Sequence, residues 1–76
     1  MSQVLIYSAD WCKYCQIAKR TMDTAGIEYQ EIDVDSNDLA GMFLQDNGFK
    51  TIPVLLVDGD KFYKGNEGLK EYMNGL

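Results

Sequence analysis

The length of the chain restricts its fold more than any other feature, because 76 residues suffice for only one small domain. A domain of this size buries about 60 to 65% of the surface that its unfolded chain exposes, which leaves no room for a second domain with its own site. Apolar residues make up 46% of the chain, enough for a core without a metal or a set of disulfides. We therefore expect residues 1–76 to form one globular domain.

The charge of the chain argues against two classes of partner. Twelve acidic side chains against seven basic ones give a net charge of -5, which disfavours both a phosphate backbone and an anionic membrane. The longest apolar run, Ile52 to Val57, contains a proline and is far shorter than the roughly 20 residues that cross a membrane. We expect the protein to bind neither nucleic acid nor membranes.

The cysteines and the N-terminal residues bear on the cellular compartment. Both cysteines lie in one tetrapeptide, unlike the dispersed set that stabilises a small secreted protein. Residues 1–7 lack the basic region and the long apolar region of a signal peptide. These features predict a soluble cytoplasmic protein, which we expect to be a monomer.

Short apolar runs alternate with segments of helical periodicity. The pattern predicts strands over 4–7, 27–34, 54–57 and 61–64, and helices from Cys12 to Ala25, from Ser36 or Asn37 to Gly48, and from Asn66 onward. This order implies two parallel strands joined by a right-handed crossover, followed by an antiparallel hairpin. The predicted fold class is α/β, with a four-stranded mixed sheet flanked by three helices in the order βαβαββα.

Capping and turn residues mark the ends of these elements. Gly26 suits a left-handed cap after the first helix, Ser36 or Asn37 caps the second, and Asn66 caps the third. Asp58-Gly59 predicts the turn of the hairpin. Apolar residues recur at helical spacing in the second helix (Leu39, Met42, Phe43) and in the third, where Leu69, Tyr72 and Met73 form the predicted inward face.

The tetrapeptide Cys12-Lys13-Tyr14-Cys15 lies where the loop after the first strand enters a helix. Residues three apart in a helical turn lie on one side, with Cα atoms roughly 5 to 6 Å apart, which a disulfide can bridge without backbone movement. The ring is too small to restrict the unfolded chain greatly, so the bond would add little stability. The pair is therefore predicted to open and close as a redox centre.

The two sulfurs are expected to differ. Cys12 lies at the helix N-terminus, where unpaired N–H groups and the helix dipole favour a thiolate and lower its pKa. The chain has no histidine, so activation falls to the helix end, the Cys15 thiol and the Lys13 ammonium. We predict that Cys12 attacks a substrate disulfide and that Cys15, buried one turn later, resolves the mixed disulfide.

Two other interpretations of the cysteines remain open at this point. They could be small core residues without chemistry, in a domain that only binds other proteins. They could also form half of a zinc site, but a tetrahedral site needs four ligands and the chain offers two thiolates and no imidazole. We predict no metal ligands.

With Ala9-Asp10-Trp11-Cys12-Lys13-Tyr14-Cys15 and Thr51-Ile52-Pro53 in view, the whole chain resembles the glutaredoxin branch of the thioredoxin superfamily. The Cys-x-Tyr-Cys motif is similar to glutaredoxins, and the Trp-Cys pair is similar to thioredoxins. The segment 48–54 is similar to the small redoxins that serve ribonucleotide reductase. The resemblance implies a thioredoxin fold with a cis Ile52-Pro53 bond that faces the cysteines.

The resemblance also implies which residues touch substrate. Trp11, Lys13 and Tyr14 would flank the cysteines, and the backbone at Thr51, Ile52 and Pro53 would pair with an extended substrate segment. A glutathione site would use Gln45 and the run from Gly65 through Asn66 to Glu67, assisted by Lys13 or Lys50. The chain departs from the glutathione pattern in two regions. Ala9 replaces a frequent lysine, and in the run 64–68 only Gly65 and the acidic Glu67 match, with Gly68 in place of a usual aspartate.

The predicted activity is that of a glutaredoxin-like thiol-disulfide oxidoreductase. Its substrates would be protein or glutathione mixed disulfides, including that of ribonucleotide reductase, and no cofactor would be permanently bound. Glutathione or thioredoxin reductase would supply electrons. The alternative function is a dimer that carries an iron–sulfur cluster through Cys12 and glutathione.

Overall fold

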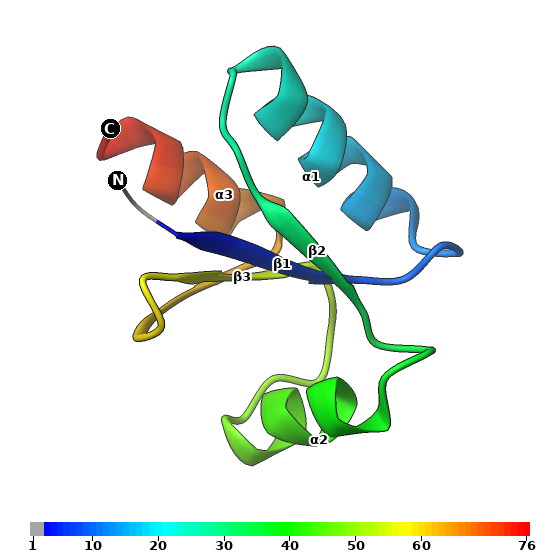
Figure 1. Ribbon diagram of the computed structural model, residues 1–76. Coiled ribbons are helices and arrows are strands. Elements are labelled where there is room, and N and C mark those ends of the chain that lie inside the picture. The colour runs from blue at the N-terminus through cyan, green and yellow to red at the C-terminus, as the bar shows by residue number, and fades with distance from the viewer. Residues whose placement is uncertain (1–2) are drawn as a thin grey trace.

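The computed structural model describes residues 3–76 and places seven elements there in the predicted order (Figure 1). In chain order they are β1 (Val4–Ser8), α1 (Lys13–Thr24), β2 (Gln30–Asp33), α2 (Asp38–Asp46), β3 (Val54–Val57), β4 (Lys61–Lys64) and α3 (Gly65–Asn74). None of the helices within residues 3–76 combines the length and apolar character needed to cross a membrane.

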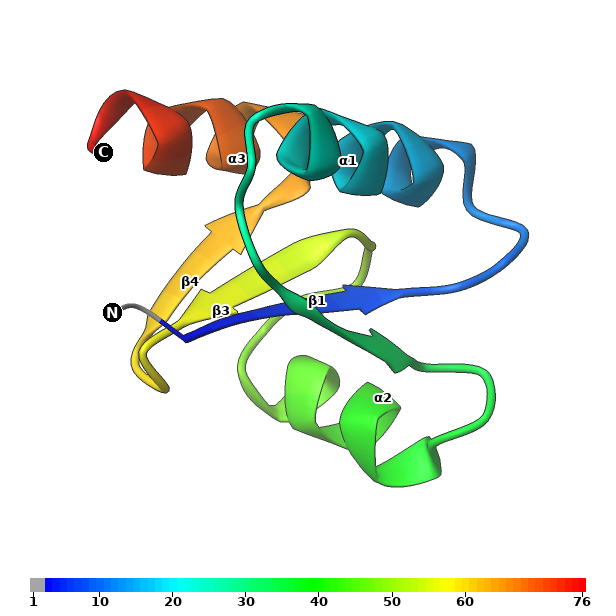
Figure 2. The same ribbon diagram turned by 45° about the horizontal axis from the view of Figure 1, so that its top comes forward.

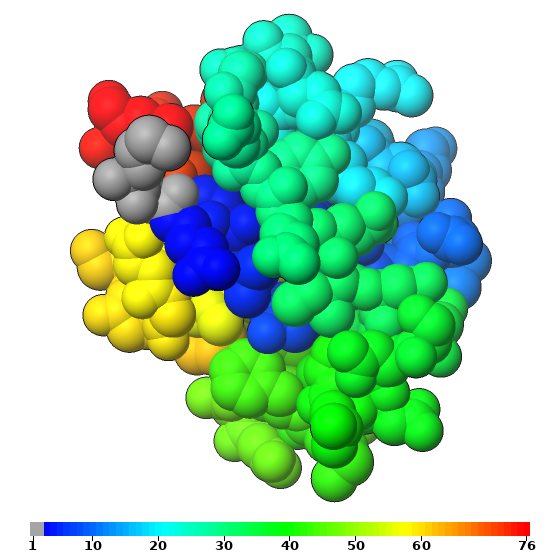
Figure 3. Space-filling model, viewed as in Figure 1, coloured from blue at the N-terminus to red at the C-terminus, as the bar shows by residue number. Residues whose placement is uncertain are grey.

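The four strands form one mixed sheet in the order β2-β1-β3-β4. β1 runs parallel to β2, whereas β3 is antiparallel to both β1 and β4. Helices α1 and α3 cover one face of the sheet and α2 covers the other (Figure 2). On the face seen in Figure 3, the chain of β2 runs between α1 and α2. The predicted mixed sheet and its parallel pair are confirmed.

The alternation of side chains along the strands builds two cores. Ile6 and Leu55 point toward α1 and α3, where Ala18, Met22, Leu69 and Tyr72 complete one cluster. Tyr7, Val54 and Leu56 point to the opposite face and pack against Ala40 and Leu44 of α2. All four residues of β3 are buried because each contributes to one of these cores, which explains its uninterrupted apolar run.

The inward face of α2 differs from the one that the apolar spacing indicates. Leu39 and Met42 are 76% and 56% exposed, whereas Ala40 and Leu44, one turn apart, face the sheet. Phe43 is at the margin, with its ring 5.9 Å from that of Tyr7. The small Ala40 lets the helix approach the sheet, so the largest side chains are not the buried ones.

The second strand is shorter than predicted, since only Gln30–Asp33 joins the sheet rather than residues 27–34. Ile27 follows α1 and takes part in its C-terminal cap, because its N–H donates to the carbonyl of Met22 at 3.0 Å across the left-handed Gly26. Val34 has already left the strand, although its N–H still donates to Ser8 at 2.9 Å. The predicted cap at Gly26 is confirmed.

The predicted cap of the second helix is Asn37, whose side chain accepts from the N–H of Ala40. The prediction that Asn66 caps the third helix is wrong. Gly65, with a φ of 67°, turns the chain from β4 directly into α3, so Lys64 takes the N-cap position without a side-chain hydrogen bond. Asn66 is already helical and its side chain is used elsewhere.

Gly68 sets how closely α3 approaches β4. A Cβ atom at this position would lie 2.7 Å from the carbonyl carbon of Tyr63, which is backbone and cannot rotate away. The position therefore requires glycine for packing, although it lies inside a helix where glycine costs about 1 kcal/mol.

We predict that Gly68→Ala lowers the free energy of unfolding by about 1 to 3 kcal/mol, because the added methyl group overpacks this contact. The matched control is Gly41→Ala in α2, where a Cβ meets nothing within 4 Å. That substitution should be neutral or stabilise by up to about 1 kcal/mol through helix propensity. Urea denaturation measures both; equal effects of the two substitutions would contradict the packing argument.

Candidate active site

Cys12 is the N-cap residue of α1, and its side chain is also an acceptor for the helix. The N–H of Cys15 donates to the Cys12 sulfur at 3.2 Å, a contact for which helices prefer a serine, threonine, aspartate or asparagine oxygen. Both cysteines are free thiols. The predicted position of Cys12 at the helix N-terminus is confirmed.

The two cysteines differ in access and in acidity. Cys12 is 5% exposed, whereas Cys15 is fully buried beside Ala9 and Cys12. Burial, followed by its hydrogen bond with the Cys12 side chain, raises the pKa of Cys15 from 9.0 to about 12. Cys15 therefore keeps its proton at neutral pH.

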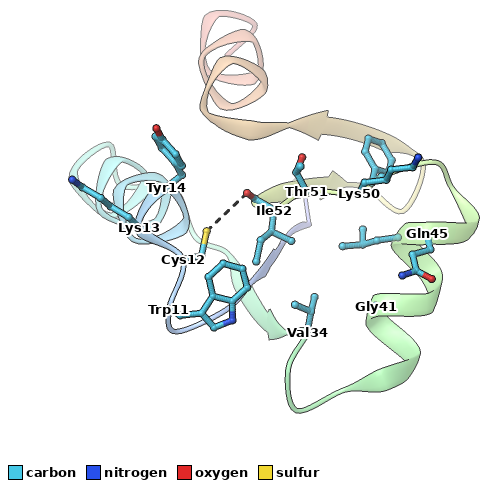
Figure 4. Close-up of a pocket in the computed structure, with 12 residues that line it drawn as sticks. Trp11, Cys12, Lys13, Tyr14, Val34, Gly41, Gln45, Lys50, Thr51 and Ile52 are labelled. Atoms are coloured by element: carbon cyan, nitrogen blue, oxygen red, sulfur yellow. Dashed lines mark hydrogen bonds between the residues drawn. The ribbon is translucent and has the colours of Figure 1, made fainter.

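The loop before β3 faces the cysteines. The Ile52-Pro53 peptide bond is cis, as the family resemblance implies, and Pro53 is buried. The carbonyl oxygen of Ile52 lies 3.9 Å from the Cys12 sulfur, which can donate its proton to it (Figure 4). The Ile52 carbonyl thus places the loop before β3 next to the start of α1.

A groove of about 600 Å³ opens beside Cys12. Six of the residues predicted to touch substrate line it, together with Lys50: Trp11, Lys13, Tyr14, Gln45, Thr51 and Ile52. Four lining residues were not predicted, namely Val34, Gly41, Leu44 and Phe49. Their sequence pattern matches that of ordinary core or helix positions, so nothing in the sequence indicated that they border a groove.

The predicted residues at the start of α3 are not in the groove lining. The N–H of Gly65 donates to the carbonyl of Pro53 at 2.8 Å, and the Asn66 side chain donates to the carbonyl of Tyr14 at 3.2 Å. Glu67 is exposed in the first turn. Two of these three residues therefore connect the start of α3 to the proline loop and to α1.

A charged pair joins α1 to β2. The Lys19 ammonium donates to Glu31 at 2.6 Å, and the hydroxyl of the fully buried Ser8 donates to the same carboxylate oxygen at 2.6 Å. These two hydrogen bonds, that from Lys19 first, lower the pKa of Glu31, and the bond to Glu31 raises the pKa of Lys19. Both groups stay charged at neutral pH.

Known proteins are similar to this chain in sequence and in fold. A glutaredoxin family model matches residues 4–62. Mycoredoxin 1 of Corynebacterium glutamicum is 39% identical over 57 residues, which cover 72% of this chain and 70% of that protein. The glutaredoxin-like protein NrdH of Escherichia coli is 32% identical over 63 residues, covering 83% and 76%.

Solved structures agree with these relatives. The NrdH-redoxin of Escherichia coli, described as having a thioredoxin-like activity profile, superposes with a TM-score of 0.84 at 30% identity and covers 97% of this chain and 93% of its own. A buckwheat glutaredoxin in complex with glutathione superposes with a TM-score of 0.79 at 25% identity, covering 97% and 71%. The predicted thioredoxin fold is confirmed.

We predict that the reduced protein loses stability at alkaline pH through Cys15. Because folding raises the pKa of Cys15 from 9.0 to about 12, the folded state keeps a proton that the unfolded chain releases above about pH 9. The stabilisation is complete below that pH and declines toward pH 12, by at most about 1.4 kcal/mol per pH unit.

Urea titrations of the reduced protein at about pH 8, 9 and 10 would measure this decline. The decline should be steeper in the wild type than in Cys15→Ala, since all other titrating groups are common to both proteins. Parallel declines would mean that burial does not hold the Cys15 proton.

Proposed function

The chain belongs to the glutaredoxin family and is a thiol-disulfide oxidoreductase, and on this premise we propose that Cys12 is its attacking thiol and Cys15 its resolving thiol. The observation that carries this assignment is the Cys15 N–H hydrogen bond to the Cys12 sulfur at the start of α1. The N–H groups and the dipole at a helix N-terminus stabilise a negatively charged sulfur in this position. Cys15, buried and protonated, is unsuited to the first attack.

The proposed cycle moves two electrons from the thiol pair to a substrate disulfide. The Cys12 thiolate attacks one substrate sulfur, the substrate S–S bond breaks, and the other sulfur leaves as a thiolate that takes up a proton. Cys15 then loses its proton and attacks the Cys12 sulfur, which releases the second substrate thiol. The products are a reduced substrate and a Cys12–Cys15 disulfide, and no cofactor takes part.

Substrate would lie in the groove beside Cys12. Ile52 and Thr51 line the groove, and the Ile52 carbonyl faces the Cys12 sulfur. We propose that an extended segment of a partner protein pairs with the backbone of this loop as an added strand. Trp11 and Tyr14 are 72% and 66% exposed and would contact the same segment. We therefore propose protein disulfides as substrates, that of ribonucleotide reductase among them, because NrdH is a relative over most of the chain.

For the reductant we propose thioredoxin reductase, with glutathione as the alternative. The position of the frequent glutathione-binding lysine is held by Ala9, which is 1% exposed and bears no charge. Gly65 and Asn66, which the glutathione pattern would assign to ligand, make hydrogen bonds within the protein. These features favour a protein reductant over a tripeptide.

We predict that Cys12→Ser abolishes disulfide reduction, because no other described thiol borders the groove. Cys15→Ser should still make the first attack and then stall as a mixed disulfide. Intact-mass spectrometry after mixing each variant with oxidised substrate would show the adduct on Cys15→Ser alone. An adduct on Cys12→Ser but not on Cys15→Ser would reverse the assignment.

A second experiment separates the two reductants. The oxidised protein is incubated with thioredoxin reductase and NADPH, or with glutathione, glutathione reductase and NADPH, and NADPH consumption is followed in the presence of insulin disulfides. The reductase system should support turnover at least about tenfold faster, since two features of a glutathione site are missing. Faster turnover with glutathione would replace the proposed reductant while leaving the roles of the cysteines intact.

A further inference from the structure

Trp11 is an exposed side chain held by a hydrogen bond. Although 72% of Trp11 is exposed, its indole N–H donates to the Asp35 carboxylate at 2.6 Å. The two residues are 24 positions apart, so this bond joins the loop before α1 to the loop after β2. A hydrogen bond to a charged acceptor is stronger than a neutral one, and it fixes the direction of a large side chain that solvent would leave free.

The loop that carries Asp35 is itself fixed in place. The N–H of Asp35 donates to the side chain of Asp33 at 2.9 Å, and the N–H of Val34 donates to the carbonyl of Ser8 at 2.9 Å. The first contact is a local turn and the second attaches the loop to the end of β1. Asp35 therefore meets Trp11 from a backbone that two hydrogen bonds hold in place.

Trp11 forms part of the groove, whereas Asp35 does not line it. In Figure 4, Trp11 lies below Cys12 with its ring directed toward Val34, and Ile52 and Thr51 lie above. The carboxylate thus acts on the groove only through the indole ring. Tryptophan side chains often dominate the binding energy of protein interfaces, because a rigid ring offers a large area at a low entropic cost.

We propose that Asp35 is a positioning residue that holds Trp11 as one wall of the groove for protein substrates, a role that rests on the proposed function. A partner segment long enough to cross the groove would pack against a ring already in place, so it would not have to immobilise that ring itself. A disulfide with two small substituents would reach the Cys12 sulfur without extending over Trp11. Loss of the hydrogen bond should therefore affect protein substrates selectively.

The experiment compares Asp35→Ala, Asp35→Asn and the control Asp10→Ala with the wild type. Asp10 is an exposed carboxylate directly before Trp11, so its removal causes the same loss of charge without touching the Trp11 hydrogen bond. Insulin and bis(2-hydroxyethyl) disulfide are the two substrates, and excess dithiothreitol regenerates the thiols, which makes the result independent of the natural reductant.

Asp35→Ala should raise the KM for insulin by about tenfold, within the range expected for a hydrogen bond to a charged group, and leave kcat for the small disulfide unchanged. Asp35→Asn should keep the KM for insulin close to the wild-type value, because its amide oxygen can accept a hydrogen bond from the indole N–H. Trp11 is the only tryptophan, so acrylamide quenching of its fluorescence should increase in Asp35→Ala alone.

An unchanged KM for insulin in Asp35→Ala would overturn the inference, and so would an equal rise of that KM in Asp10→Ala. In either case the activity of the wild type would still support the proposed function. Equal losses on both substrates, together with a lower urea midpoint, would also overturn it by showing a merely structural role. A wild-type protein that reduced neither substrate would overturn the proposed function itself.

Discussion

The hydrogen bond from the Cys15 N–H to the Cys12 sulfur is the contact on which the rest of the site depends. It begins α1, because a helix must satisfy its first N–H groups and Cys12 takes the place of the usual oxygen acceptor. It also holds the Cys12 sulfur beside the carbonyl of Ile52 and at the mouth of the groove. The start of the helix and the proposed chemistry therefore share one atom, the Cys12 sulfur.

Hydrogen bonds and close packing hold together three segments around this contact that are distant in the sequence: the start of α1, the proline loop before β3 and the start of α3. The start of α3 is joined to the proline loop by Gly65 and to α1 by Asn66, and Gly68 lets α3 pack closely against β4. The family resemblance assigns this stretch to a ligand, but here Gly65 and Asn66 donate hydrogen bonds to the protein's own carbonyls, while Glu67 is exposed. These residues therefore stabilise the fold, and this is a physical reason to expect that the groove binds glutathione weakly.

The sequence predicted the element order, because apolar runs of strand length alternate with helical spacing and the Gly26 and Asn37 caps follow local rules. Prediction was less successful where tertiary packing determines which side chains are buried and where a helix begins. The exposure of Leu39 and Met42 depends on how close the small Ala40 lets α2 approach the sheet, and the start of α3 depends on Gly65 bonding to Pro53. The roles of the cysteines were predicted from their position at a helix start, and most of the groove residues were predicted from the family resemblance. Val34 and Asp35 were not, because only the assembled fold brings the loop after β2 to Trp11.

The position of Asp35 also resolves a conflict between charge and binding. The chain carries an excess of acidic residues, yet no acidic side chain is among the described residues that line the groove, and its two cations there are Lys13 and Lys50. A carboxylate inside the groove would repel a substrate thiolate as it leaves Cys12. Placed behind the indole ring, the Asp35 charge contributes orientation without entering the space in which negative charge develops. An acidic protein can thus use one of its many carboxylates at the site and still keep the path to Cys12 free of negative charge.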